Sequence, residues 1–343
     1  MKHKGLIALL VATAGAVAVA VLVSFSGDNA GIDPEANKPV LPEIAKRLGE
    51  VQRVTLVHGD AKTTLLRQGE NWVVEEKGDY PADGPKLHQT LLGLAELRYV
   101  EEKTRKPELY PRLEVEDAGK AGAKSTLITV SDAKGSLLGE IIAGKRRIDE
   151  LGGGTDGIYV RKPGNAQSWL ASGTLDLPDD AAQWLDRSIV DVPNDQVKEV
   201  VLTQPDGSSL DIARDKPEAK LALRGAPKDT KLKSDDVLVE PTTALASLTL
   251  SDVRPAAKMP LPETGVAHAV FTSFDGLTVK VALFDQDGKS WATFAVSGSG
   301  AAEKEAATLN AKLSPWVYAI PDYKAKSLRT KLADVTAPPP KPS

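Results

Sequence analysis

An internal repetition constrains the fold of this chain more than any other feature of its sequence. Short alternating segments followed by a helical pattern occur twice, in the same order. Four equivalent positions are separated by 146, 147, 151 and 147 residues: Val54 and Val200, Arg67 and Arg214, Leu97 and Leu248, and Trp169 and Trp316. Because independent landmarks share one near-constant spacing, we predict two tandem copies, covering residues 47–194 and 195–335.

Each predicted copy opens with three short strands and later forms a hairpin. The opening strands are expected at residues 51–56, 63–67 and 72–75, and again at 197–202, 209–214 and 221–223. The hairpins are expected at 125–143 and 278–296, and further strands at 158–161 and 169–171. Neighbouring strands joined by short turns are antiparallel, so the predicted fold class is α+β, with an antiparallel sheet and a helix in each copy.

The helix of the first copy is predicted more clearly than that of the second. Asp83 is expected to cap a helix that presents leucines at 87, 91, 94 and 97 on one face. In the second copy Ser234 or Asp235 would cap a segment that ends at Leu248. Pro241 interrupts that segment, so it marks the first helical turn or kinks the helix.

An uncharged apolar run at residues 5–25 predicts a transmembrane helix. Its 21 residues would extend about 31 Å as a helix, enough to cross the hydrocarbon core of a bilayer. Lys2 and Lys4 precede the run, which favours a cytoplasmic N-terminus at residues 1–4 and export of the remainder. A cleaved signal peptide is the alternative, because small residues at 16, 18 and 20 resemble a cleavage site.

The segments that flank the predicted copies have the composition of linkers. Residues 26–46 contain three prolines and two glycines among acidic and small residues, which predicts a tether. Residues 336–343 are rich in proline and are expected to form a disordered tail. The chain has no cysteine, which excludes a disulfide framework.

Composition argues against several classes of function. A net charge of −4 with both signs interspersed is not the electrostatic footprint of a nucleic-acid-binding protein. Four scattered histidines do not predict a metal centre, and we expect no cofactor. Without a thiol or a Gly-x-Ser-x-Gly motif, nucleophilic catalysis lacks its usual residues. Adjacent acidic residues are more typical of caps and opposite strand faces than of an acid–base pair, so we predict no catalytic residue.

One group of residues has the character of a recognition surface. Arg146, Arg147, Tyr159, Arg161 and Trp169 combine arginine with aromatic residues on predicted strands. Such combinations are typical of interaction hot spots, so these five residues are the candidate partner-binding site. In the alternative interpretation Trp169 packs in the core and the arginines extend over it.

Four segments resemble the bacterial family called Domain of Unknown Function 4340. They are residues 91–98 (LLGLAELR), 109–113 (LYPRL), 157–164 (GIYVRKPG) and 184–189 (WLDRSI). The second copy lacks a clear Tyr-Val-Arg segment. The resemblance implies a single-pass protein of the bacterial inner membrane with most of its chain in the periplasm. It also implies genes often placed beside ABC-transporter components of the gliding-motility type, and it supplies no catalytic residues.

These observations favour a non-enzymatic accessory or scaffold module, anchored by residues 5–25, that assists an ABC-type transport or envelope complex. Its expected partner is an integral-membrane or envelope protein, contacted through sheet edges or faces. One alternative is a binding module for an envelope glycan, lipid or peptide, which would require a deep pocket. A second is a glycan hydrolase, which would require two carboxylates roughly 5–9.5 Å apart in a cleft.

Overall fold

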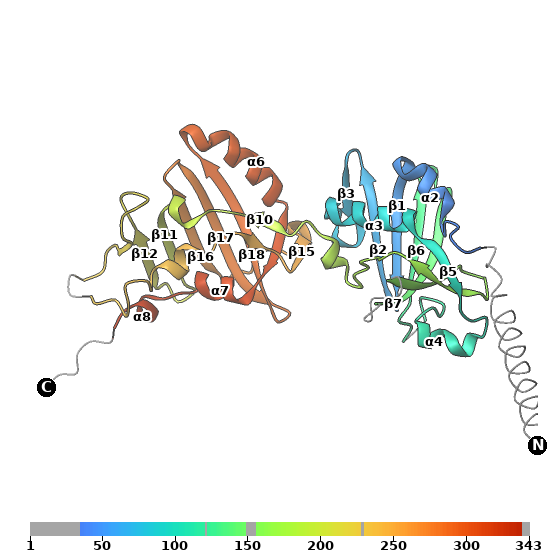
Figure 1. Ribbon diagram of the computed structural model, residues 1–343. Helices are drawn as coiled ribbons and strands as arrows, with labels where there is room; N and C mark the ends of the chain where they lie inside the picture. Colours follow the sequence, from blue (N-terminus) through green and yellow to red (C-terminus); the bar gives the residue numbers. More distant parts are fainter. Residues whose placement is uncertain (1–34, 121, 149–155, 228–229, 338–343) are drawn as a thin grey trace, which may run out of the picture. The chain divides into compact units, whose positions relative to one another are not determined.

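The computed structural model describes residues 35–120, 122–148, 156–227 and 230–337 (Figure 1). The expected N-terminus at 1–4, the expected transmembrane helix at 5–25 and the tail from 338 onward lie outside these residues. Of the helices that the structure describes, none combines the length and the apolar character needed to cross a membrane.

Two compact units make up the described chain. The first contains residues 35–51, 57–60 and 90–176, and the second contains residues 52–56, 61–89 and 177–337. These units differ from the predicted ranges 47–194 and 195–335, because residues 52–56, 61–89 and 177–194 group with the later part of the chain.

Antiparallel sheets dominate the structure, so it is a sheet-rich α+β protein as expected. The first large sheet has nine strands, in the order β4 (Tyr80–Pro81), β3 (Asn71–Val74), β2 (Ala61–Gln68), β1 (Val51–His58), β6 (Thr126–Asp132), β7 (Leu137–Arg147), β8 (Gly157–Arg161), β9 (Ser168–Ser172) and β5 (Arg98–Glu102). A separate two-stranded sheet pairs β10 (Ser188–Val190) with β14 (Leu248–Thr249).

The second large sheet lies wholly within the second unit. Its eight strands follow the order β13 (Ala222–Leu223), β12 (Ser209–Ala213), β11 (Val197–Thr203), β16 (Ala267–Ser273), β17 (Leu277–Gln286), β18 (Lys289–Gly298), β19 (Trp316–Ile320) and β15 (Asp252–Pro255). Apart from β4, each strand of the first sheet has a counterpart at the same place in the second. In both sheets an early strand, β5 or β15, pairs at the edge with the last strand, β9 or β19.

The first predicted helix is present as α3 (Gly84–Glu96). Asp83 caps it, since its carboxylate accepts a 2.9 Å hydrogen bond from the Lys86 backbone N–H. The four leucines that were expected on one face are all buried. Their 3.6-residue period therefore identified the face of α3 that packs into the core.

The predicted helix of the second copy is much shorter than expected. Only α5 (Val239–Thr242) forms, followed by turns that lead to Leu248. Pro241 has no N–H to donate, and it lies within this single turn. Three helices follow the second hairpin that were not predicted: α6 (Glu303–Leu313), α7 (Asp322–Leu328) and α8 (Leu332–Val335).

The predicted tether at 26–46 is wrong for its last residues, which are folded. Helix α2 (Pro42–Arg47) begins there, and Val40 and Ile44 are completely buried. Asn37 and Val40 donate backbone hydrogen bonds to the Tyr99 and Leu97 carbonyls, so this segment runs along the free side of β5. The apolar side chains within a proline-rich stretch explain why it folds against the sheet. A short helix, α4 (Tyr110–Leu113), follows β5 in the same unit.

Residues 77–80 are joined to the second sheet by polar and aromatic contacts. The Lys77 ammonium lies 2.7 Å from the buried Asp252 carboxylate, which also receives Lys289 at 3.0 Å. The Tyr80 ring meets Trp316 edge to face, with centroids 4.9 Å apart. Buried aromatic contacts of this kind explain why residues 61–89 belong to the second unit.

Candidate functional site

The structure does not bring the five predicted site residues together on one surface. Strand pairing places Tyr159 opposite Leu170 and Arg161 opposite Ser168, whereas Trp169 lies opposite Val160. Because side chains alternate along a strand and paired residues share a face, Tyr159 and Arg161 lie on one face of the sheet and Trp169 on the other.

Arg161 is a buried structural residue rather than an exposed contact. Its side chain is only 4% exposed. The guanidinium donates to the Val115 carbonyl at 2.8 Å and to the Asn165 carbonyl at 3.1 Å, and it pairs with Asp117 at 2.5 Å. It also lies 4.6 Å from the centre of the Tyr110 ring. Tyr159 is half-buried and packs against the same apolar cluster of Tyr110, Val115 and Ile142. The expectation that Arg161 meets a partner is therefore corrected.

Arg146 and Arg147 are the exposed members of the predicted group. They end strand β7, opposite Ile158 and Gly157 of β8. Within the described part of the chain, neither guanidinium forms an ion pair or a side-chain hydrogen bond. These two cations are thus available to a partner, but they are separate from Trp169.

Trp169 packs as the alternative interpretation expected, and it also lines a hollow. Its side chain is 8% exposed and meets Tyr99 with ring centroids 4.7 Å apart. Beside these rings is a hollow of about 460 Å³, here called the Trp169 hollow. Its lining residues are Glu35, Tyr99, Glu102, Arg105, Lys162, Asn165, Ala166, Gln167 and Trp169.

The Trp169 hollow has an aromatic base and a charged rim. Burial, followed by the nearby Glu35 carboxylate, raises the pKa of the Tyr99 hydroxyl. On the rim Arg105 pairs with Glu102 at 3.6 Å and donates to the Gln167 side-chain oxygen. Lys162 is exposed, and its ammonium has no partner among the described residues. An apolar base surrounded by charges is the arrangement that receives one side chain of a protein partner.

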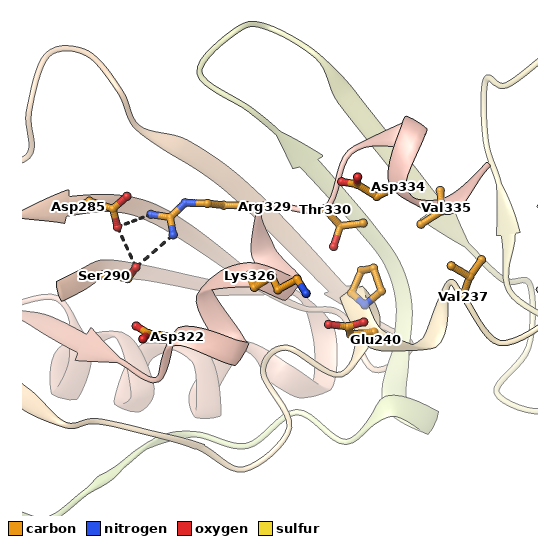
Figure 2. A pocket seen from close by; sticks show the side chains of 11 residues that line it. Val237, Glu240, Asp285, Ser290, Asp322, Lys326, Arg329, Thr330, Asp334 and Val335 are labelled. Atoms are coloured by element: carbon orange, nitrogen blue, oxygen red, sulfur yellow. Dashed lines mark hydrogen bonds and ion pairs between the residues drawn. The ribbon is translucent and has the colours of Figure 1, made fainter. Parts of the chain in front are cut away.

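A second cavity lies in the second unit, beside α7 (Figure 2). We call it the α7 pocket; its volume is about 620 Å³. It is lined by the side chains of α7 and the following turn (Asp322, Lys326, Arg329, Thr330), by α8 (Asp334, Val335), by Val237 and α5 (Glu240, Pro241), and by the β17–β18 hairpin (Asp285, Ser290).

One wall of the α7 pocket is a closed polar network. Arg329 donates to the Asp285 carboxylate at 2.7 Å and to the Ser290 hydroxyl at 3.1 Å, and Ser290 donates to the same Asp285 oxygen at 2.8 Å. Figure 2 shows Arg329 reaching toward this pair, while Lys326 extends the other way. Each member of the network thus fixes the orientation of the other two.

The remaining charged groups of the α7 pocket form fewer hydrogen bonds. One Glu240 oxygen accepts a 3.3 Å hydrogen bond from the Ser327 hydroxyl, and Asp334 accepts one from the Lys331 backbone N–H. The Lys326 ammonium and the Asp322 carboxylate have no side-chain partner in the described residues. The pocket therefore offers both signs of charge to a ligand, with carboxylates in excess.

Most residues of either cavity could not be recognised from the sequence pattern. Asp285 and Ser290 flank a hairpin turn, while Lys326 and Arg329 follow nearly 40 residues later on an element that was not predicted. Only the spacing of Asp322 and Lys326, one helical turn apart, could have indicated a shared face. Among the described residues, no group of three or more His, Asp or Glu side chains is placed to hold a metal ion.

Comparison with known proteins identifies the family. A family described as Domain of unknown function (DUF4340) matches residues 72–266, more than half of the 343 residues. The chain belongs to this family. The match includes all four of the segments that carried the resemblance. No curated protein matches the chain.

Proposed function

We propose that this member of the DUF4340 family is a non-enzymatic accessory module, anchored in the bacterial inner membrane, that assists an ABC-type transport or envelope complex from the periplasmic side. The apolar run at 5–25 supports the anchor. Attachment to a membrane would raise the concentration of the module beside an integral-membrane partner.

Two tandem copies of one sheet-based fold are part of this proposal. The matching strand orders of the two large sheets, together with the repeated sequence spacing, support a duplication. Local turn chemistry alone does not explain why β5 and β15 each pair with the last strand of their sheet. Descent from one repeated unit explains both pairings.

The Trp169 hollow is the main structural support for binding to a partner. Its base is formed by two packed aromatic rings and its rim by charges of both signs. We expect a side chain of the partner to enter it, and the exposed Lys162 to meet an acidic group at the rim.

Crosslinking in native membranes tests this function. A photo-crosslinking residue at position 162 of the full-length chain should capture an integral-membrane or envelope protein, identified by mass spectrometry. The same residue at Lys134, which is exposed on the β6–β7 turn, is the matched control. With a crosslinker at a neighbouring rim position, Lys162→Glu should lower the yield several-fold. Equal products from positions 162 and 134, or no membrane protein at all, would count against the proposal.

The anchor has its own prediction. The full-length chain should remain with the membrane after extraction at alkaline pH, while a variant lacking residues 5–25 should be released. A full-length chain that is extracted completely, or that is recovered without its first 25 residues, would contradict a retained anchor.

A second function, ligand binding, is favoured by the α7 pocket. Its volume of about 620 Å³ is within the usual range for small-molecule sites, and two of its charged groups, Lys326 and Asp322, have no side-chain partner in the part of the chain that the structure describes. Ligand occupancy there would let the accessory module respond to the contents of the envelope.

A further inference from the structure

The charges of the α7 pocket define a class of ligand. Four carboxylates and two cations line it: Glu240, Asp285, Asp322, Asp334, Lys326 and Arg329. Arg329 and Asp285 neutralise each other within their network with Ser290. One cation, Lys326, then remains beside three carboxylates, and Asp334 is partly occupied by its backbone hydrogen bond.

This balance disfavours purely anionic and purely neutral ligands. An anion would meet one free ammonium and several unneutralised carboxylates, so repulsion would offset the attraction. A neutral ligand would gain no attraction from the exposed charges of Lys326 and Asp322. A ligand that brings one carboxylate for Lys326 and ammonium groups for Glu240 and Asp322 would satisfy both signs, and charge-assisted hydrogen bonds are the stronger kind.

The fixed network prepares the pocket for such a ligand. Ser290 is 8% exposed, and its hydroxyl is held by both Asp285 and Arg329. The β17–β18 wall is therefore fixed before binding, while Lys326 retains the freedom of an exposed side chain. Preorganised walls reduce the entropic cost of binding, and a mobile lysine adapts to the position of a carboxylate.

We propose that the α7 pocket binds a basic amino acid or a short peptide that ends in one: a small molecule with two ammonium groups and one carboxylate. This inference rests on the ligand-binding function favoured above and specifies its substrate class. Lys326 receives the carboxylate, and Glu240 and Asp322 receive the ammonium groups.

Calorimetry with four probes tests the ligand class on the full-length chain in detergent. The probes are lysine, cadaverine (the same chain without the carboxylate), 6-aminohexanoate (one ammonium fewer) and N-acetylglucosamine, which is neutral. Lysine should bind at least fivefold more tightly than each of the other three. Equal affinity for lysine and cadaverine would overturn the role of Lys326.

Variants test which pocket residues bind the carboxylate of the ligand and which bind its ammonium groups. Lys326→Met should weaken lysine at least tenfold and leave cadaverine unchanged or slightly tighter, because a repelling cation is removed. Glu240→Gln combined with Asp322→Asn should weaken both. The matched control is Lys280→Met, which removes an exposed lysine on β17, outside the pocket. It should change the affinity for neither lysine nor cadaverine. Unchanged circular dichroism and melting temperature verify that each variant is folded.

The outcomes separate the ligand class from the ligand-binding function. N-acetylglucosamine binding that Glu240→Gln abolishes would keep the function and overturn the class. Failure of all four probes to bind at millimolar concentration would overturn both. Lysine binding that Lys326→Met does not change would place the ligand elsewhere and overturn the proposed site.

Discussion

At Arg161, one guanidinium holds together segments that are distant in the sequence. It bonds to the Val115 and Asn165 carbonyls and to Asp117, and it covers the Tyr110 ring. The hydrogen bond from Arg161, opposed by partial burial and supported by its charge, holds the pKa of Asp117 below its usual value. The loop between α4 and β6 is thus secured by a side chain from β8.

Replacing Arg161 tests this role. Arg161→Met should reduce the free energy of unfolding by about 2–4 kcal/mol, because the buried Val115 carbonyl loses its donor and the Asn165 carbonyl and Asp117 lose theirs. Arg146→Met, at an exposed position on β7, should change it by less than about 0.5 kcal/mol. Urea unfolding followed by tryptophan fluorescence measures both. Similar values for the two variants would contradict the structural role of Arg161.

Arg161 is buried and Arg146 is exposed, and the sequence pattern could not predict this difference. Strand periodicity placed Arg161 correctly on a strand, but its face is covered by Tyr110 of α4 and by Val115 of the following loop, about 50 residues earlier in the chain. Coverage of a sheet face is a tertiary property, so the local pattern could not distinguish a buried arginine from an exposed one.

Among the elements, hairpins were predictable and several helices were not. Asp287 and Gly288 adopt positive φ angles of 52° and 72°, as a two-residue turn between β17 and β18 requires. In contrast, α6 has mostly polar and small residues and buries only Ala306 and Leu313. Such a sparse apolar stripe is difficult to recognise, because alanine on the buried face gives little contrast with its neighbours.

Packing of α6 on β18 depends on the absence of a side chain at Gly298. An added Cβ would lie 2.5 Å from the Ala302 carbonyl oxygen and 2.8 Å from the Ala306 Cβ. Gly298→Ala should therefore lower the free energy of unfolding by about 1–3 kcal/mol, the usual cost of overpacking. Gly84→Ala, at the start of α3 where nothing lies within 4 Å, should be neutral or stabilising. Thermal unfolding by circular dichroism compares them, and an equally tolerated Gly298→Ala would show that α6 can shift.

At the scale of the whole molecule, Asp252 joins the early part of the second unit to the second large sheet. Its carboxylate lies on β15 of that sheet and forms an ion pair with Lys77. Burial alone would raise the pKa of Asp252, but hydrogen bonds from Lys77, Lys289 and the Val253 backbone lower it. Its pKa in the folded state is therefore below the value of about 3.9 expected in an unfolded chain. Ionised Asp252 thus stabilises the fold above about pH 4, and this contribution is lost as the pH falls through the folded-state pKa.

The pH dependence of unfolding tests this connection. Between pH 5 and pH 2, Asp252→Asn should lose stability less steeply than the parent chain, because one depressed carboxyl pKa has been removed. Asp287→Asn, which changes an exposed carboxylate in a turn, should follow the parent curve. Urea midpoints at half-unit pH intervals measure the slopes. Parallel curves for Asp252→Asn and the parent would show that the two lysines do not stabilise its ionised form.

The edge position of β5 has a consequence for synthesis of the chain. This strand emerges before β6, β7 and β8, but its partner within the sheet, β9, is the last strand of that sheet to be made. Meanwhile the segment at residues 37–40 already exists and can occupy the other side of β5 through the bonds to Leu97 and Tyr99. An exposed strand is a template for unwanted association. The residues just before α2 thus protect one edge of β5 from the start, so that only the edge that pairs with β9 stays open until that strand is made.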